Sequence, residues 1–259
     1  MNGVAPYPYV TAVLVDGEFF VRRQRRLRPK IAPEDVAKDL LTMALAHMMD
    51  TNCQQISHLY RILFYDAPPL NKKAHLPISG QPIDFSKTKT YTFRTQLHFE
   101  LRKTRKVALR LGALRDARRW VMKPDATKDL IKGNRAISNL SDDDFFYDVK
   151  QKGVDIRLGL DVASLAYKKL VNRIVLVTGD SDFVPAAKLA RREGVEVILD
   201  PMWQKVHDHL YEHIDGLWSV ITKGGKFRCS ESARRKRAKK RRQRDGRFDS
   251  NKSQPDTVS

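Results

Sequence analysis

The sequence predicts an α/β protein with three layers, in which a central, mostly parallel sheet carries helices on both faces. Short apolar runs rich in β-branched residues alternate along the chain with segments whose apolar residues recur at helical spacing. Strands separated by helices pair in parallel, because each crossover returns the chain to the same edge of the sheet. The apolar runs also stop at Asp, Gly or Pro, as buried strands do where they enter loops.

The first half of the chain supplies two strands and one helix. Residues 10–15 (VTAVLV) predict a strand that ends at Asp16-Gly17. A helix is expected from Pro33, since proline suits the first helical turn and apolar residues follow at helical spacing. Residues 59–65 (LYRILFY) predict the second strand, which Asp66 and two prolines end.

The middle of the chain is harder to interpret. Residues 71–92 are rich in Pro, Lys, Ser and Thr, and predict a long loop. The pattern around Trp120 permits a third strand. Residues 71–150 contain no recognisable motif, so we interpret them as an insertion that sets substrate choice.

In the second half of the chain, segments with helical spacing again alternate with short apolar runs. This alternation predicts, in order, a helix over residues 155–170, a strand over 173–178, a helix over 183–192 and a strand over 195–199. Residues 1–230 are therefore expected to form one domain. Residues 231–259, with 11 basic and 4 acidic residues, are expected to be a disordered tail, because they have little apolar surface to bury.

The charge balance points to a polyanionic partner. The chain has 49 Lys and Arg against 30 Asp and Glu, a net charge of +19, which is typical of proteins that bind nucleic acid. No stretch approaches the roughly 20 apolar residues that span a bilayer, and the start lacks the order of a signal peptide, so a soluble, cytoplasmic protein is expected. Cys53 and Cys229 are the only cysteines and lie far apart, so neither a disulfide framework nor a CxxC pair is expected, and a structural zinc site of the thiolate type is not expected either.

Acidic residues follow three of the predicted strands. Asp16, Asp66 and the pair Asp180 and Asp182 should meet at one edge of the sheet, because the carboxyl ends of parallel strands share an edge. Crowded carboxylates repel one another unless a cation lies between them, and their oxygens suit Mg²⁺ or Mn²⁺. Asp182 is alternatively an N-cap of the next helix, and Asp66 alternatively a turn residue.

Four strings occur in the order in which a known family has them: VLVDG, YRILFYDAPP, QKGVDIRLGLDVASLA and IVLVTGDSDFVPAAKLARREGVEVILD. Over roughly residues 9–220 the chain thereby resembles the NYN domain, and more narrowly its LabA-like (DUF88) branch within the PIN-like nuclease superfamily. The resemblance implies a PIN-like fold and a metal-dependent (endo)ribonuclease. It assigns Asp16, Asp155, Asp180 and Asp182 to catalysis and metal binding, and Asp161 to metal binding. In one continuous helix Asp155 and Asp161 would differ by about 240° around the axis, so Asp161 ranks lower.

Basic and aromatic residues near the acids suggest how single-stranded RNA, the expected substrate, would bind. Polybasic segments hold phosphate backbones. The candidates are Arg22, Arg23, Arg25, Arg26, Lys152 and, in the tail, Arg234, Arg235, Lys236 and Arg237. Phe19, Phe20 and Tyr65 either stack on unpaired bases or pack in the core.

Two other classes of protein share parts of this pattern. A haloacid-dehalogenase-like phosphatase would need a DxDx[TV] motif, where this chain has Asp16-Gly17-Glu18-Phe19. A non-catalytic nucleic-acid-binding or adaptor protein with the same fold would have nearly the same sequence. Phosphate-binding glycine motifs of nucleotide-triphosphate and dinucleotide proteins are absent. The oligomeric state is not predicted.

Overall fold

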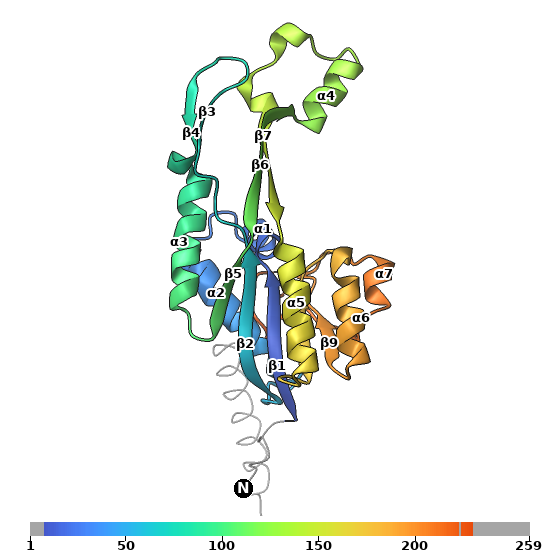
Figure 1. Cartoon of the computed structure of the whole chain (residues 1–259). Coiled ribbons are helices and arrows are strands. Elements are labelled where there is room, and N and C mark those ends of the chain that lie inside the picture. Colours follow the sequence, from blue (N-terminus) through green and yellow to red (C-terminus); the bar gives the residue numbers. More distant parts are fainter. Residues whose placement is uncertain (1–7, 223, 230–259) are drawn as a thin grey trace, which may run out of the picture.

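The computed structural model describes residues 8–222 and 224–229. Within them, the main sheet has six strands, all parallel, in the order β10-β9-β8-β1-β2-β5 (Figure 1). The strands are β1 Tyr9–Asp16, β2 Ser57–Asp66, β5 Val107–Leu111, β8 Arg173–Val177, β9 Glu196–Leu199 and β10 Gly216–Leu217. None of the described helices is long and apolar enough to span a bilayer.

Helices cover both faces of the sheet, and each face has its own apolar core. One core joins α1 Gly17–Leu27, α2 Pro33–His47 and α3 Lys89–Lys103 to alternate residues of β1, β2 and β8. The other core joins the opposite face to α5 Val154–Tyr167, α6 Val184–Arg192 and the short α7 Asp208–Tyr211. The three-layer parallel α/β fold predicted from the sequence is confirmed.

A two-stranded antiparallel ribbon rises from the carboxyl edge of the sheet (Figure 1). It consists of β6 Ala113–Met122 and β7 Phe145–Lys152, and α4 Pro124–Ile131 lies at its far end. The strand expected around Trp120 is therefore present as β6, but it belongs to this ribbon and not to the main sheet.

The expectation of a long loop over residues 71–92 is wrong. The segment contains the hairpin β3 Lys73–His75 and β4 Pro82–Asp84, the turn Phe85–Lys87 and the start of α3. Strands of three residues are too short to show an alternating pattern. The first half of α3 buries few side chains, so its apolar period is weak. The supposed insertion at 71–150 thus contributes α3 and β5 to the central layers.

The structure also overturns the expectation for the cysteines. Cys53 and Cys229 form a disulfide, with their Cα atoms 5.2 Å apart and 176 residues between them in sequence. The loop after α2 and the segment after β10 meet at this point, and only the folded chain brings the two cysteines together.

Candidate active site

Two predicted acids lie where the strand order reverses. β1 and β8 are neighbours, but the chain leaves β1 toward β2 on one side and leaves β8 toward β9 on the other. In parallel α/β sheets ligands bind in the crevice at such a switch point, outside the carboxyl ends of the strands. Asp16 is the last residue of β1, and Asp180 follows the end of β8. Both occupy the position at which ligands bind in such folds.

Asp16 is fixed at the start of α1. Gly17 lets the start of α1 pack closely against β2, since a Cβ atom at this residue would lie 2.5 Å from the carbonyl oxygen of Tyr65. The Oδ1 atom of Asp16 accepts a hydrogen bond of 3.1 Å from the backbone N–H of Phe19. The pKa of Asp16 is raised to about 6. Burial is the largest cause and the charges of Glu18, Asp155 and Asp180 act in the same direction, while the Phe19 hydrogen bond opposes them.

Asp155 reaches the same edge from the first turn of α5. Gly153 begins this helix with a φ of 76°, in the left-handed region that glycine adopts without strain. The Asp155 side chain is exposed on the surface. Local desolvation raises its pKa, and so do the charges of Asp180 and Asp182.

Asp180 and Asp182 lie in a tight turn at Ser181–Phe183, between β8 and α6. The Oδ1 atom of Asp180 accepts a hydrogen bond of 3.0 Å from the backbone N–H of Asp182. The N-cap of α6 is Phe183, without a side-chain bond, so the alternative that Asp182 caps this helix is wrong. The Asp182 side chain is exposed.

The donor chemistry of this cluster suits a hard cation. The charges of Asp155 and Asp180 raise the pKa of Asp16, and the charge of Asp180 raises the pKa of Asp155. Over residues 8–222 and 224–229, no three His, Cys, Asp or Glu side chains are placed so that they could hold a metal ion. Mg²⁺ typically takes only one or two carboxylates and completes its shell with water and substrate phosphate. A cation here would bind one or two of these carboxylates and would take its other ligands from water and substrate phosphate.

Two other acids lie in ion pairs instead. Asp161 accepts hydrogen bonds from the Tyr65 hydroxyl at 2.9 Å and from Arg110 Nε at 3.1 Å. Asp66 is fully buried and is bonded by Arg94 and His98. Burial opposes its charge, but His98 and Arg94 outweigh this effect and hold the pKa of Asp66 below its usual value. Asp66 is thus neither a simple turn residue nor a member of the cluster.

The predicted basic residues divide into two groups. Arg22, Arg25 and Arg26 are exposed on α1, and Lys152 is exposed at the end of β7. Arg23 is 8% exposed, and its Nε atom donates a hydrogen bond of 3.0 Å to the carbonyl oxygen of Met202. A phosphate could reach Arg23 only after this bond breaks, so its place in the expected binding set is not supported. The tail residues Arg234, Arg235, Lys236 and Arg237 lie outside the described residues.

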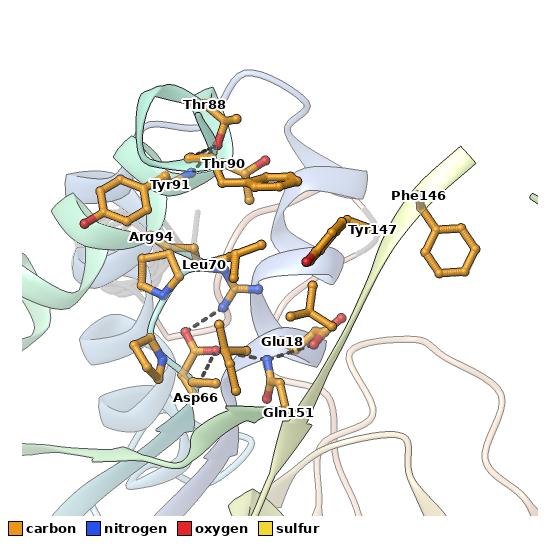
Figure 2. Close-up of a pocket in the computed structure, with 16 residues that line it drawn as sticks. Glu18, Asp66, Leu70, Thr88, Thr90, Tyr91, Arg94, Phe146, Tyr147 and Gln151 are labelled. Atoms are coloured by element: carbon orange, nitrogen blue, oxygen red, sulfur yellow. Dashed lines mark hydrogen bonds and ion pairs between the residues drawn. The ribbon is translucent and has the colours of Figure 1, made fainter. Parts of the chain in front are cut away.

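The aromatic residues near Asp16 pack in the core. Phe19, Phe20 and Tyr65 are at most 2% exposed, which decides between the two roles left open for them. A different set of rings lines a cavity next to the cluster, between α3 and the ribbon (Figure 2). Sequence reasoning missed this cavity, although alternation in FFYDVKQK (residues 145–152) could have indicated the strand that forms one wall.

The chain matches one known family over part of its length. Residues 90–209 match the NYN domain. The match begins in α3, ends in α7 and includes Asp155, Asp180 and Asp182, whereas Asp16 precedes it. NYN domains are PIN-like nucleases, so the match supports a nuclease-type function, hydrolase chemistry and a nucleic-acid substrate.

No curated protein matches the chain. Among solved structures, the chain is similar to a protein of unknown function from Vibrio parahaemolyticus. The identity is 14% and the TM-score 0.44, over 85% of this chain and 98% of that one.

Proposed function

We propose that the protein is a divalent-metal-dependent nuclease that hydrolyses phosphodiester bonds in single-stranded RNA. The observation that supports the proposal is that the charges of Asp155, in the first turn of α5, and Asp180, in the loop after β8, act on Asp16 at the carboxyl end of β1. The charges of Asp155 and Asp180 raise the pKa of Asp16, and the charge of Asp180 raises the pKa of Asp155, so a cation would be favourable here. The high net charge of +19 suits a polyanion.

In this proposal one or two carboxylates of the set Asp16, Asp155, Asp180 and Asp182 bind Mg²⁺ or Mn²⁺ directly, and water and substrate phosphate complete its shell. When bound, such an ion orients a phosphodiester, activates water and neutralises charge on the leaving oxygen. The capping bond to Phe19 fixes Asp16, and the bond to the Asp182 backbone fixes Asp180, so neither carboxylate has to be ordered when substrate arrives. Arg22, Arg25, Arg26 and Lys152 bind flanking phosphates. Asp161, paired with Arg110, serves at most as an outer support.

The wider assignments belong to the same proposal. The motifs VLVDG, KGVD and GDSDF favour the LabA-like branch of NYN domains. We propose one domain over residues 1–230 and a tail over 231–259 that tethers RNA through its positive charge. We also propose that the protein acts in the cytoplasm.

The decisive experiment is cleavage of end-labelled single-stranded RNA with Mn²⁺ or Mg²⁺. Wild-type protein should cleave, EDTA should stop cleavage, and Asp180→Asn should lower the rate at least 100-fold while remaining folded, since the exchange removes a charge but little volume. Asp215→Asn, which alters an acid paired with Arg191 elsewhere on the fold, is the matched control. Undiminished cleavage by Asp180→Asn, or after full chelation, would contradict the proposal.

A second candidate function is favoured by one observation. The net charge of +19 suits binding of a polyanion whether or not the strand is cleaved. A non-catalytic nucleic-acid-binding protein would bind RNA, keep its affinity in EDTA and leave the labelled strand intact under all metal conditions.

A further inference from the structure

A cavity of about 550 Å³ lies beside the carboxylate cluster, between α3 and the ribbon (Figure 2). Its volume falls in the range of roughly 300–1,000 Å³ that is common for ligand pockets. Glu18 borders it, and the charge of Glu18 also acts on the carboxyl group of Asp16. The cavity therefore lies near the proposed active site, and none of the acids assigned to that site lines it.

The floor of the cavity carries charges that are already paired. Asp66 accepts from Arg94, from His98 and from the backbone N–H of Ala67. The side-chain amide of Gln151 donates to Glu18 at 2.9 Å and to Asp66 at 3.4 Å (Figure 2). This network presents carboxylates and amides to the cavity and little net positive charge. A phosphate would meet the Glu18 carboxylate, and the Arg94 guanidinium is already paired with Asp66, so the floor does not suit a second phosphate site.

The walls are apolar and aromatic. Pro68, Pro69 and Leu70, from the loop after β2, line the cavity. Tyr91 comes from α3 and Tyr147 from the ribbon (Figure 2). Tyr147 is held in place before any ligand arrives. Its hydroxyl accepts from Lys72 Nζ at 2.7 Å, and its ring packs against Phe85 and Trp120, with centroids 5.1 and 5.2 Å away.

We propose that this cavity binds one unpaired base of a single-stranded nucleic acid, next to the phosphate that lies at the carboxylate cluster. The inference rests on the proposed function and adds a specificity site to it. A base matches both parts of the cavity. Its faces stack on aromatic rings, and its edge carries N–H donors that a carboxylate or amide oxygen accepts.

The test measures binding, so that it does not depend on turnover. Full-length protein carrying Asp180→Asn is titrated with a fluorescent single-stranded RNA and with a series of the same RNA, each lacking one base. One abasic position should raise Kd roughly 5- to 150-fold, the range expected for loss of one base stacked on an aromatic ring. Tyr147→Leu should raise the Kd of the intact RNA by a similar factor. It should leave the Kd of the RNA that lacks this one base unchanged, because the stacking is already lost there.

Tyr167→Leu is the matched control, because Tyr167 is an exposed tyrosine at the last turn of α5. It should leave every Kd unchanged. Since Tyr147 also supports Phe85 and Trp120, Tyr91→Leu provides a second variant should Tyr147→Leu fail to fold. A flat abasic scan, or equal weakening of all RNAs by either tyrosine variant, would overturn the cavity proposal even if wild-type protein cleaves RNA. A position-specific effect without any cleavage would instead support the cavity and contradict the nuclease.

Discussion

Burial and three neighbouring carboxylates make the charge of Asp16 costly in the folded protein. Its pKa of about 6 lies above the ordinary value of 3.8. Between these two pH values the folded chain therefore keeps a proton on Asp16 that the unfolded chain has already lost. Stability must then fall as pH rises from about 4 to about 6, by an amount on the order of 3 kcal/mol, and remain lower above that range.

Asp16→Asn should therefore raise the melting temperature of the metal-free protein at pH 8 and change it little at pH 4. The side-chain oxygen of asparagine can still accept the N-cap hydrogen bond of α1, so the helix loses little stability. Thermal unfolding in EDTA at both pH values measures the effect. Asp161→Asn is the control, because it breaks a pair with Arg110 and should not stabilise the protein at pH 8. An equal gain at both pH values would show that charge is not the cause.

The carboxylate cluster was partly predictable from single residues. Asp16 and Asp180 follow buried strands, and topology alone brings such residues together. Asp155 begins a helix, so only the family resemblance indicated it. The pairing of Asp66 with Arg94 and His98 could not be foreseen, because α3 shows no clear helical period and its position over β2 is set by packing.

At the scale of an element, α1 has two kinds of arginine. Arg22, Arg25 and Arg26 face solvent, while Arg23 bonds to the carbonyl oxygen of Met202. The sequence of α1 shows only a run of arginines. The position of each arginine around the helix determines whether its side chain is exposed and can bind a ligand.

Replacing Arg22, Arg25 and Arg26 together by Gln should flatten the plot of log K for RNA against log salt by about 2, at roughly 0.7 for each phosphate that is no longer neutralised. The melting temperature should change little. Arg23→Gln should do the reverse, lowering the melting temperature and leaving the slope nearly unchanged, because it removes hydrogen bonds inside the fold. Binding isotherms at several salt concentrations and thermal unfolding check both. A larger drop in salt dependence for Arg23→Gln than for the triple variant would contradict this division.

Elements with strong apolar patterns were predicted well, and those built from tertiary contacts were not. β1, β2 and β8 are buried over most of their length and β9 over half of it, and all four appear in the sequence as apolar runs. β5 is only partly buried, and the ribbon exposes much of its surface, so their alternation is weak. The cavity needs residues from α1, the loop after β2, α3 and β7 at once, which no local pattern records.

At the scale of the whole molecule, the disulfide joins the loop after α2 to the segment after β10. Closing a loop with 176 residues of separation should stabilise the folded state by about 5 kcal/mol according to the chain-entropy relation. Reduction, or Cys53→Ser, should lower the denaturant midpoint without abolishing the α/β circular-dichroism signal.

Thiol alkylation before and after reduction, followed by mass measurement, shows whether the bond forms in the cell. Disulfides are uncommon in the reducing cytoplasm, so a fully alkylated protein from cytoplasmic extracts would indicate that the two thiols stay reduced there. Thr127→Ala, a change in the exposed helix α4, should leave the midpoint unaltered and controls for nonspecific effects. An unchanged midpoint after complete reduction would contradict a stabilising role.

The disulfide between Cys53 and Cys229 also determines how the molecule responds to mechanical force. If the two chain ends are pulled apart, tension passes from Cys53 directly to Cys229 and bypasses everything between them. The central strand β1 lies on the loaded path, whereas its neighbours β2 and β8 lie within the shielded loop. Pulling should thus draw β1 out of the sheet while its neighbouring strands stay within the loop that the disulfide closes. Adding a reductant should release roughly 600 Å of contour length from that loop.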